Sequence, residues 1–549
     1  MKTPVAELEG KGTVDVETGE IREIRMAGSK VALEKIIRRF PRLQAALPTD
    51  VGFSGESDFD LSLAGTWDYL SLHFSMDLAP AVLTYRKIFS KPKDFPLTVS
   101  GDLVLKGGSL LSGDLSIRLA GTMIKTALVG LDFKSGETEV TFLTNKFALD
   151  GWQGLLNFLA GHTVAGSAKV LLHWDGNLND PRTAAQTLNV TLDGASFLSA
   201  DGRGLRNAVL FLDVGELGLR VKDTSFEIGN SPVRLTGEIY NFNANPQRKG
   251  NLTLESFSLE PVAALDHLKV LKPLLPSREA KRRWTETEKK IRQIFPAEVP
   301  LEGLKLAAKF QPGKFVVENL SFRALDGDFQ FRGEADSASP PPRFWVESDL
   351  AHVSLSRYFE KRGRGAKPLE GNLFFKGKFQ GQGWKASELE KNLTGEGTLS
   401  LTNGDWRALD LLTPLTRLDV LRSLHAYAGR STSFSDLNAK WTYGKGKFDT
   451  EDLLLNSGEL WVEGEGDLSW EGAFNGRLEV YLSKPLTEKV LRAWGEEEHM
   501  GKQLGPFPFL FLGQFEKPEV RPEARSMASF LEAVRARKFR KILRSPFKE

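Results

Sequence analysis

The sequence contains no cysteine, and this absence excludes several kinds of protein. Without cysteine there is no disulfide framework, no zinc site with cysteine ligands and no thiol catalysis. Neither sign of charge is in excess: the sequence has 73 Lys and Arg and 71 Asp and Glu, which gives a formal net charge of +2. A nucleic-acid-binding protein usually gathers a basic excess on one face, so we expect no nucleic-acid partner.

Long apolar runs are also missing. No run approaches the roughly 18–20 residues that a membrane-spanning helix needs, and the longest, "LLNFLAG" and "FPFLFLG", have the length of strands. The first residues, "MKTPVAELEGKGTVDVETG", lack the apolar core of a signal peptide. The protein therefore either needs no export or is the soluble part of a longer chain.

Motifs that carry catalytic chemistry are absent from the sequence. The seven histidines are scattered, and none pairs with another at metal-ligand spacing. There is no G-x-S-x-G turn, no phosphate-binding glycine loop and no calcium loop. The stretch "GEGDLSWEG" carries acidic residues and glycines, but its carboxylates alternate with apolar residues as on the wet face of a strand. We expect no enzyme activity, no metal and no cofactor.

Segments in which apolar and polar residues alternate are abundant in the sequence. In "LWVEGEGDLSW" (460–470), Leu460, Val462, Leu468 and Trp470 point one way, while Glu463 and its polar neighbours point the other way. This is the pattern of a strand with one apolar and one wet face. Similar strand–glycine–strand segments recur along the chain, with 52 glycines in all. Glycine inside a strand marks a bulge or bend, so the sheet is expected to curl.

A longer repeat joins these strands. The segments 147–159, 257–268, 353–361 and 480–491 each end a strand with an apolar residue and leucine, then break, then form a short helical turn. Such a plan is typical of an array of stacked β-units. The predicted fold class is mostly β, a long curled antiparallel sheet of stacked repeat units that forms an open apolar groove.

Few helices interrupt this plan. We expect short helices at 29–47, 278–295 and 409–427, and an amphipathic C-terminal helix at 524–545. The expected organisation, in chain order, is an N-terminal strand and helix segment (1–50), β-groove units (51–272), a charged helical insert (273–300), a further β-groove unit (301–392), a C-terminal β region (393–523) and a basic amphipathic helix (524–549).

The function depends on what covers the apolar face of the strands. The helices are too few to do so, which leaves a closed sandwich or an open curled trough. Burying acyl chains is worth about 0.8 kcal/mol per CH₂ group, so such a trough can bind lipid without directional contacts. Periodicity alone leaves both alternatives open.

The order of several segments resembles the AsmA family. "LTGEGTLSLTNGDWRALDLL" (393–412), "STSFSDLNAKWTYGKGKFDTEDLLLNSGELWVEGEGDLSW" (431–470) and "LGPFPFLFLGQFEKPEVRPE" (504–523) are similar to the C-terminal region of that family. The stretches 166–183 and 228–242 resemble its repeat units. The resemblance implies an envelope protein of a Gram-negative bacterium, anchored in the inner membrane by one N-terminal helix, with a periplasmic β-groove that carries phospholipids. That anchor is missing here, so we expect it to belong to a longer chain.

The resemblance favours the open trough, and with it two sets of candidate residues. The groove residues occupy inward positions of alternating strands: Leu235, Phe331, Phe375, Leu460, Val462, Leu468, Trp470, Leu478, Val480, Leu482, Phe507, Phe509 and Phe511. The residues expected to contact a membrane or a partner lie in the C-terminal helix: Phe530, Leu531, Arg535, Arg537, Lys538, Arg540 and Lys541.

The predicted function is therefore non-enzymatic, a bridge-like transport of phospholipids between the inner and outer membranes that supports outer-membrane biogenesis. The expected partners are phospholipids with their acyl chains in the groove, membrane surfaces, and envelope proteins at either end. The alternative is a structural or scaffold β-repeat protein of the cell envelope, whose apolar faces pack on each other as a closed sandwich array.

Overall fold

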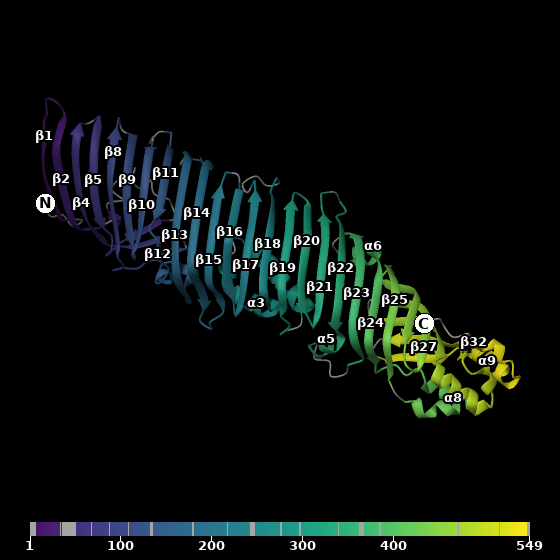
Figure 1. Ribbon diagram of the computed structural model, residues 1–549. Coiled ribbons are helices and arrows are strands. Elements are labelled where there is room, and N and C mark those ends of the chain that lie inside the picture. The colour runs from purple at the N-terminus through teal and green to yellow at the C-terminus, as the bar shows by residue number, and fades with distance from the viewer. Residues whose placement is uncertain are drawn as a thin grey trace. The chain divides into compact units, whose positions relative to one another are not determined.

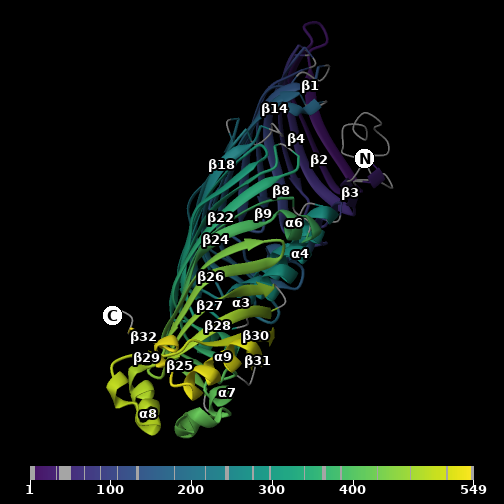
Figure 2. The ribbon, with the colours of Figure 1, turned by 90° about the vertical axis from the view of Figure 1, so that its right-hand side faces the viewer.

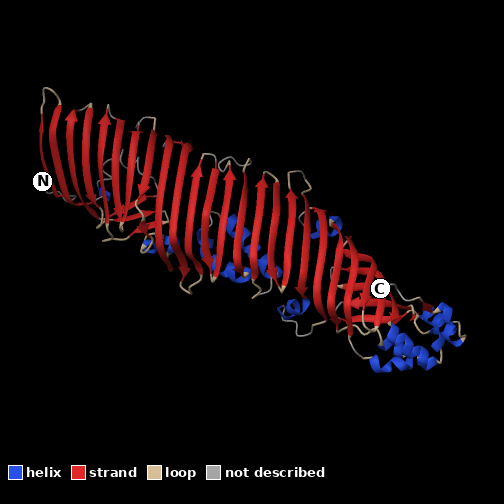
Figure 3. Ribbon diagram, viewed as in Figure 1, coloured by secondary structure: helices blue, strands red, loops and turns tan. Residues whose placement is uncertain are grey.

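The computed structural model describes residues 7–32, 34–35, 51–66, 68–86, 88–107, 109–131, 135–177, 180–216, 218–241, 247–274, 277–295, 298–338, 340–361, 367–383, 386–429, 431–469, 472–514 and 517–545. The chain divides into two compact units, Met1–Gln293 and Ile294–Glu549. Antiparallel strands dominate each unit and helices are few (Figure 1, Figure 3). The expectation of a mostly β, antiparallel fold is confirmed.

The strands of the first unit follow one another in a single antiparallel ladder, in chain order apart from a few short strands. Its members are β1 (Glu7–Val14), β2 (Glu20–Ala32), β4 (Glu56–Thr66), β5 (Tyr69–Asp77), β8 (Leu97–Lys106), β9 (Ser109–Leu119), β10 (Thr122–Leu131), β11 (Glu137–Thr144), β13 (His162–Asn177), β14 (Asp180–Ser199), β15 (Gly204–Gly215), β16 (Gly218–Ile228), β17 (Ser231–Tyr240) and β18 (Lys249–Leu259). The short β12 (Phe147–Ala148) pairs with β13.

Bulges interrupt this ladder where the sequence supplies glycine. The register between β13 and β14 shifts at Gly166, and that between β14 and β15 shifts at Gly194. Both glycines have positive φ, 95° and 60°. A Cβ added to Gly166 would come within 2.4 Å of the Gly194 carbonyl oxygen, so the two bulges lie against each other. Bulges increase the local twist and bend of a strand.

A small second sheet covers one end of the first unit's strands. It consists of β3 (Val51–Ser54), β6 (Val82–Tyr85) and β7 (Phe89–Lys91), with the short helices η1 (Trp152–Gly154) and η2 (Asn157–Leu159) nearby in the fold. Leu155, between the two helices, is fully buried and shares a small core with Leu97 of β8 and Leu119 of β9.

Lys91 holds this small sheet together from inside. Its side chain is fully buried, and its ammonium group donates hydrogen bonds to the carbonyl oxygens of Ala79 (2.9 Å), Ala81 (2.6 Å) and Pro92 (2.8 Å). Burial lowers the pKa of this ammonium group below its usual value. The unfolded chain therefore holds the proton more tightly, and the free energy of unfolding should rise with pH between the lowered pKa and the usual one.

Replacing this lysine tests its structural role. Lys91→Met should lower the free energy of unfolding by about 1–3 kcal/mol, because it removes the donor to the buried carbonyl oxygen of Ala81. Lys93→Met is the matched control, since Lys93 is exposed, and it should change stability by less than about 0.5 kcal/mol. Urea denaturation of both variants measures the difference; equal values would show that the ammonium group contributes nothing.

Three helical segments end the first unit. They are α3 (Pro261–Leu268), η3 (Lys269–Leu274) and α4 (Arg278–Ile294), the last of which confirms the helix expected at 278–295. Pro261 opens α3, where its missing N–H group costs nothing. Ala264 of α3 packs against Ile228 and Val233, which covers the ends of β16 and β17.

The second unit repeats the same architecture with an antiparallel ladder in chain order. Its strands are β19 (Leu301–Gln311), β20 (Lys314–Ala324), β21 (Gly327–Asp336), β22 (Arg343–Ser354), β23 (Leu369–Gln382), β24 (Thr394–Trp406), β25 (Thr432–Gly444), β26 (Lys447–Asn456), β27 (Leu460–Ser469), β28 (Ala473–Leu482), β30 (Phe507–Gln514) and β31 (Lys517–Pro522).

Helices lie between several strands of this unit and after its last long strand. The unit contains α5 (Leu355–Lys361), α6 (Ala386–Asn392), α7 (Thr413–Thr416), η4 (Asp419–Tyr427), α8 (Lys484–Trp494), η5 (Glu497–His499), α9 (Ala524–Arg535) and η6 (Phe539–Lys541). The two-residue strands β29 (Gln503–Leu504) and β32 (Leu543–Arg544) pair with each other.

Two of the expected helices differ from the structure. Residues 29–32 belong to strand β2, and the rest of the helix expected at 29–47 lies largely outside the described residues. The C-terminal helix α9 ends at Arg535, ten residues before the expected end. The segment after it alternates Phe539, Ile542 and Leu543, which are buried, with exposed basic residues, so packing of the apolar residues takes precedence over helix propensity.

Candidate functional site

One face of the first unit's ladder is apolar over most of its strands. Residues directly opposite each other in an antiparallel pair lie on the same face, so the register connects Met26 to Leu61, Leu61 to Phe74, and Phe142 to Leu172. We call this surface the apolar face; in the first unit it includes Met26, Leu61, Leu63, Leu70, Leu72, Phe74, Met76, Leu103, Leu115, Ile124, Leu128, Phe142, Leu172, Leu188, Val190, Leu212, Val214, Leu219, Leu235 and Ile239.

These side chains remain partly exposed. In β5 every residue that points to the apolar face is half-buried and every residue that points away is exposed. In β2, the strand next to the edge strand β1, the side chain of Met26 is 38% exposed. In the part of the chain that the structure describes, the small sheet and α3 cover only the ends of some strands. An antiparallel sheet normally buries its apolar face against a second layer, so this face has room for a further occupant.

The opposite face of the same strands is polar and forms ion pairs with itself. His73 lies 2.7 Å from Asp102 on the neighbouring strand, and Lys146 lies 2.5 Å from Asp193. Exposed pairs of this kind contribute little to stability. Their importance is that they identify the water-facing side of the ladder.

The first strands of the second unit have an apolar face of the same kind, which the same rule identifies. Its residues there are Leu306, Val317, Leu320, Phe322, Phe329, Phe331, Val346, Leu350, Phe375, Phe379 and Leu399. They too are partly exposed, Val346 by 37%. Phe322 stacks on Phe329 with ring centroids 4.9 Å apart, so aromatic rings form part of the surface.

Aromatic side chains form a compact group where β23, β24 and β25 meet. Trp441 stacks on Phe375 (5.2 Å between centroids) and on Phe379 (5.1 Å). Its ring lies over Gly377 and Gly397, where an added Cβ would come within 2.7 and 2.6 Å of the indole. The two glycines are therefore required for this packing, which buries Trp441.

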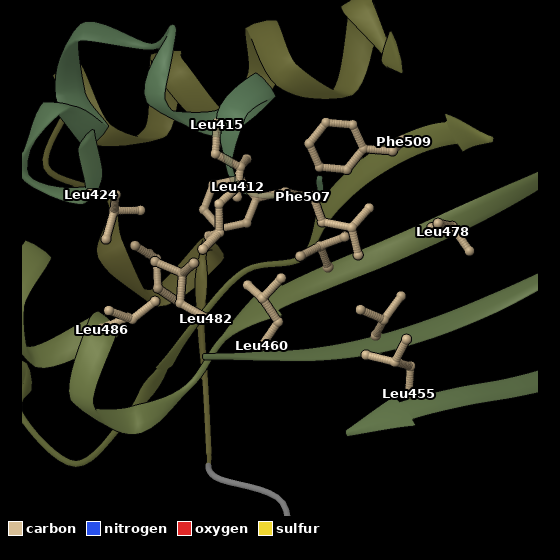
Figure 4. Packing of buried hydrophobic residues seen from close by; sticks show 14 of the residues in the cluster. Leu412, Leu415, Leu424, Leu455, Leu460, Leu478, Leu482, Leu486, Phe507 and Phe509 are labelled. Carbon is tan, nitrogen blue, oxygen red and sulfur yellow. The ribbon is translucent and has the colours of Figure 1, made fainter. Parts of the chain in front are cut away.

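Beyond Trp441, helices cover the same face. Val462, Val480, Leu482 and Phe507 have exposed fractions of 0–1%. Leu415 of α7, Leu424 of η4 and Leu486 of α8 pack into the same cluster (Figure 4), together with Met527 and Phe530 of α9. We call this cluster the capped core. It is a conventional interior of buried apolar side chains.

Most of the residues predicted to line the groove belong to the capped core. Leu460, Val462, Leu478, Val480, Leu482, Phe507, Phe509 and Phe511 point to the expected face, but the chain's own helices cover them, so the expectation that lipid contacts them is wrong. Leu235, Phe331, Phe375 and Leu468 remain partly exposed on the apolar face. Trp470 lies outside the described residues. Glu463 and Glu479 lie opposite each other on the polar face, the side on which the alternation of apolar and polar residues places them.

The sequence did contain a signal for this correction. The apolar segment 409–427, expected as a helix, forms α7 and η4, and its Leu415, Leu421 and Leu424 are fully buried. So many apolar residues on a short helical segment need an apolar surface to cover. The apolar faces of the strands in that unit supply this surface, so the two sequence patterns taken together predict the cover.

The C-terminal residues predicted to contact a membrane separate into two groups. Phe530 is buried against Phe507, with ring centroids 4.7 Å apart, and Leu531 packs at the edge of the capped core. Their apolar surface is thus used inside the protein. The basic residues Arg535, Arg537, Lys538, Arg540 and Lys541 are all exposed.

Helix α4 attaches to α3 through charged side chains. Asp266 accepts hydrogen bonds from Lys269 (2.9 Å) and Arg292 (2.5 Å), and Lys269 also lies 3.1 Å from Glu288. Figure 2 shows α3 and α4 on the same side of the strands. Partial burial alone would raise the pKa of Asp266, but the hydrogen bonds from Lys269 and Arg292 hold it below its usual value. This contact is therefore present above about pH 4 and weakens as the pH falls through the lowered pKa.

A hollow of about 910 Å³ lies along β20–β25 and has a mixed lining. Charged residues of the polar face line it together with Phe331 and Trp441 of the apolar face. Its charges are compensated by pairs such as Arg332 with Glu347 and Lys376 with Asp349 (3.0 Å). Elsewhere, Glu496, Glu498 and His499 lie close together, but Glu496 also faces Arg537 at 4.0 Å. Neither arrangement brings together a nucleophile and a base.

No helix in the described ranges is long and apolar enough to cross a membrane. In comparisons with known proteins, no family model matches the chain and no curated protein matches it in sequence.

Proposed function

We propose that the apolar face binds the acyl chains of phospholipids and lets the lipids move along the ladder, in keeping with bridge-like transport between the inner and outer membranes of a Gram-negative envelope. The observation that carries this proposal is the partial exposure of the apolar side chains over consecutive strands of both units. The resemblance to the AsmA family in the order of its segments supports the same function.

The width of the apolar face suits an acyl chain. In β5 the inward positions are Leu70, Leu72, Phe74 and Met76, and four alternate positions span about 20 Å at about 3.4 Å per residue. The hydrocarbon core of a bilayer is about 30 Å thick, so the chains of one leaflet need about 15 Å. An acyl chain that lies along a strand would remain on apolar side chains, with its headgroup at the polar edge of the ladder.

Site-specific photo-crosslinking tests this proposal. A benzophenone side chain in place of Leu172 or Phe375 should capture phospholipid in cells, because both residues lie on the apolar face. The matched controls are the neighbouring residues His173 and Lys376, which point to the opposite face and should capture at least tenfold less lipid. Mass spectrometry of the purified adducts measures the outcome.

The alternative function, a scaffold whose apolar faces pack on one another, gives a different product in the same experiment. Crosslinkers at Leu172 and Phe375 would then join two protein chains, and organic extraction of the purified protein would yield no phospholipid. Equal lipid labelling on both faces would also contradict the assignment of the apolar face.

A further inference from the structure

The end of the second unit carries a concentrated positive charge that the capped core does not use. From Arg535 to Ser545 the sequence reads RARKFRKILRS, with the basic residues Arg535, Arg537, Lys538, Arg540, Lys541 and Arg544 and no acidic residue. All six basic side chains are exposed. We call Arg535–Ser545 the basic segment. In a chain with a net charge of only +2, this is a marked local excess.

Apolar anchors fix the basic segment in place. Phe539, Ile542 and Leu543 point inward and are buried, and Phe539 stacks on Trp494 with ring centroids 5.9 Å apart. Leu543 and Arg544 also form strand β32 with Gln503 and Leu504. The anchors and the charged residues alternate, so the buried side chains hold the basic ones on the outer surface.

Little within the protein neutralises these charges. Arg537 is 4.0 Å from Glu496, and the Arg544 guanidinium lies over the ring of Tyr481 at 4.9 Å. Arg535, Lys538, Arg540 and Lys541 make no ion pair with any residue that the structure describes. Four long cationic side chains therefore remain available to an external anionic partner.

We propose that the basic segment docks this end of the second unit on the surface of an anionic lipid bilayer. The charges are spread over a helix end, a turn and a short strand, an arrangement that suits a surface of many headgroups. Within the second unit, α9 and β32 lie past the last long strands (Figure 1), where a flat surface can approach. This inference rests on the proposed function, since it names the surface at which lipids would enter or leave.

The structure also specifies how the docking works. The apolar stripe of α9, with Met527, Phe530 and Ala533, is buried in the protein, so the helix has no free apolar face to insert between lipids. The contact is electrostatic and peripheral. It should therefore depend on anionic lipid and disappear when salt screens the charges.

Vesicle flotation of the full chain tests this mode of docking. The protein should bind vesicles of phosphatidylglycerol and phosphatidylcholine at low salt, and binding should fall at least tenfold in 0.5 M NaCl or on vesicles of phosphatidylcholine alone. Replacing Arg535, Lys538, Arg540 and Lys541 together by Gln should weaken binding several hundredfold, at about fivefold per basic residue.

The matched control removes four charges elsewhere. Arg282, Arg283, Lys289 and Lys290 of α4 are exposed, and their replacement by Gln should leave vesicle binding within about twofold. Equal loss in both variants, or equal binding to neutral vesicles, would overturn the proposal. The proposed function fails separately, because lipid capture by a crosslinker at Leu172 does not require the basic segment.

Discussion

The Val480→Asp variant is expected to lose the folded C-terminal end of the second unit, whereas the same change at Leu172 should leave its unit folded. Both residues point to the apolar face of an antiparallel ladder, and the sequence pattern around them is the same. Val480 is fully buried in the capped core, so an aspartate there must be desolvated or protonated at a cost of several kcal/mol. Leu172 is partly exposed, and an aspartate there keeps much of its water.

Denaturation and limited proteolysis measure this contrast. Val480→Asp should lower the free energy of unfolding by about 4 kcal/mol or more and expose α8 and α9 to protease, and Leu172→Asp should lower it by less than about 1.5 kcal/mol. The isosteric Val480→Thr, which replaces one methyl group by a hydroxyl, should lie between these values. Equal destabilisation at both positions would mean that the apolar face of the first unit is as well covered as the capped core.

The second large effect concerns lipid movement. Leu235→Asp should stop transfer of a fluorescent phospholipid between vesicles, or slow it at least tenfold, because it puts a charge in the path of the acyl chains. Leu235 lies on the apolar face of β17, paired with Leu254 of β18. The adjacent Arg234 is exposed on the opposite face, and Arg234→Asp should leave the transfer rate within about twofold.

Phe375→Asp extends the same test to the second unit, with Lys376→Asp as its control. Circular dichroism and urea denaturation must show that each variant is folded before its transfer rate is compared. A folded Leu235→Asp protein with an unchanged rate would contradict a continuous path for lipid along the apolar face.

The strands could be predicted from the sequence because each carries its own signal. Alternation in "LWVEGEGDLSW" placed Leu460 and Val462 on one face and Glu463 on the other, as the structure has them. Glycines such as Gly166 likewise marked bulges. These features depend on residues within a few positions of one another, and a single sequence is enough to read them.

What covers each face could not be read in the same way. Val462 and Leu63 occupy equivalent positions in similar strands, yet Val462 is buried and Leu63 is partly exposed. The difference arises from η4 and α8, which are separated from Val462 by tens of residues in sequence. Alternation fixes which way a side chain points, and tertiary packing decides whether protein or another substance lies against it.

The hairpin connections of both ladders have a consequence for how the protein is made. From β13 to β18 and from β19 to β28, each strand pairs with the strand that precedes it in the chain. Contacts are thus local in sequence, and their closure entropy is small. A chain that emerges from the ribosome with its N-terminus first can add each strand to the edge already formed, without waiting for its C-terminus. The capped core forms last, when α9 arrives, and until then the growing edge presents unpaired backbone groups on which a chaperone of extended segments would act.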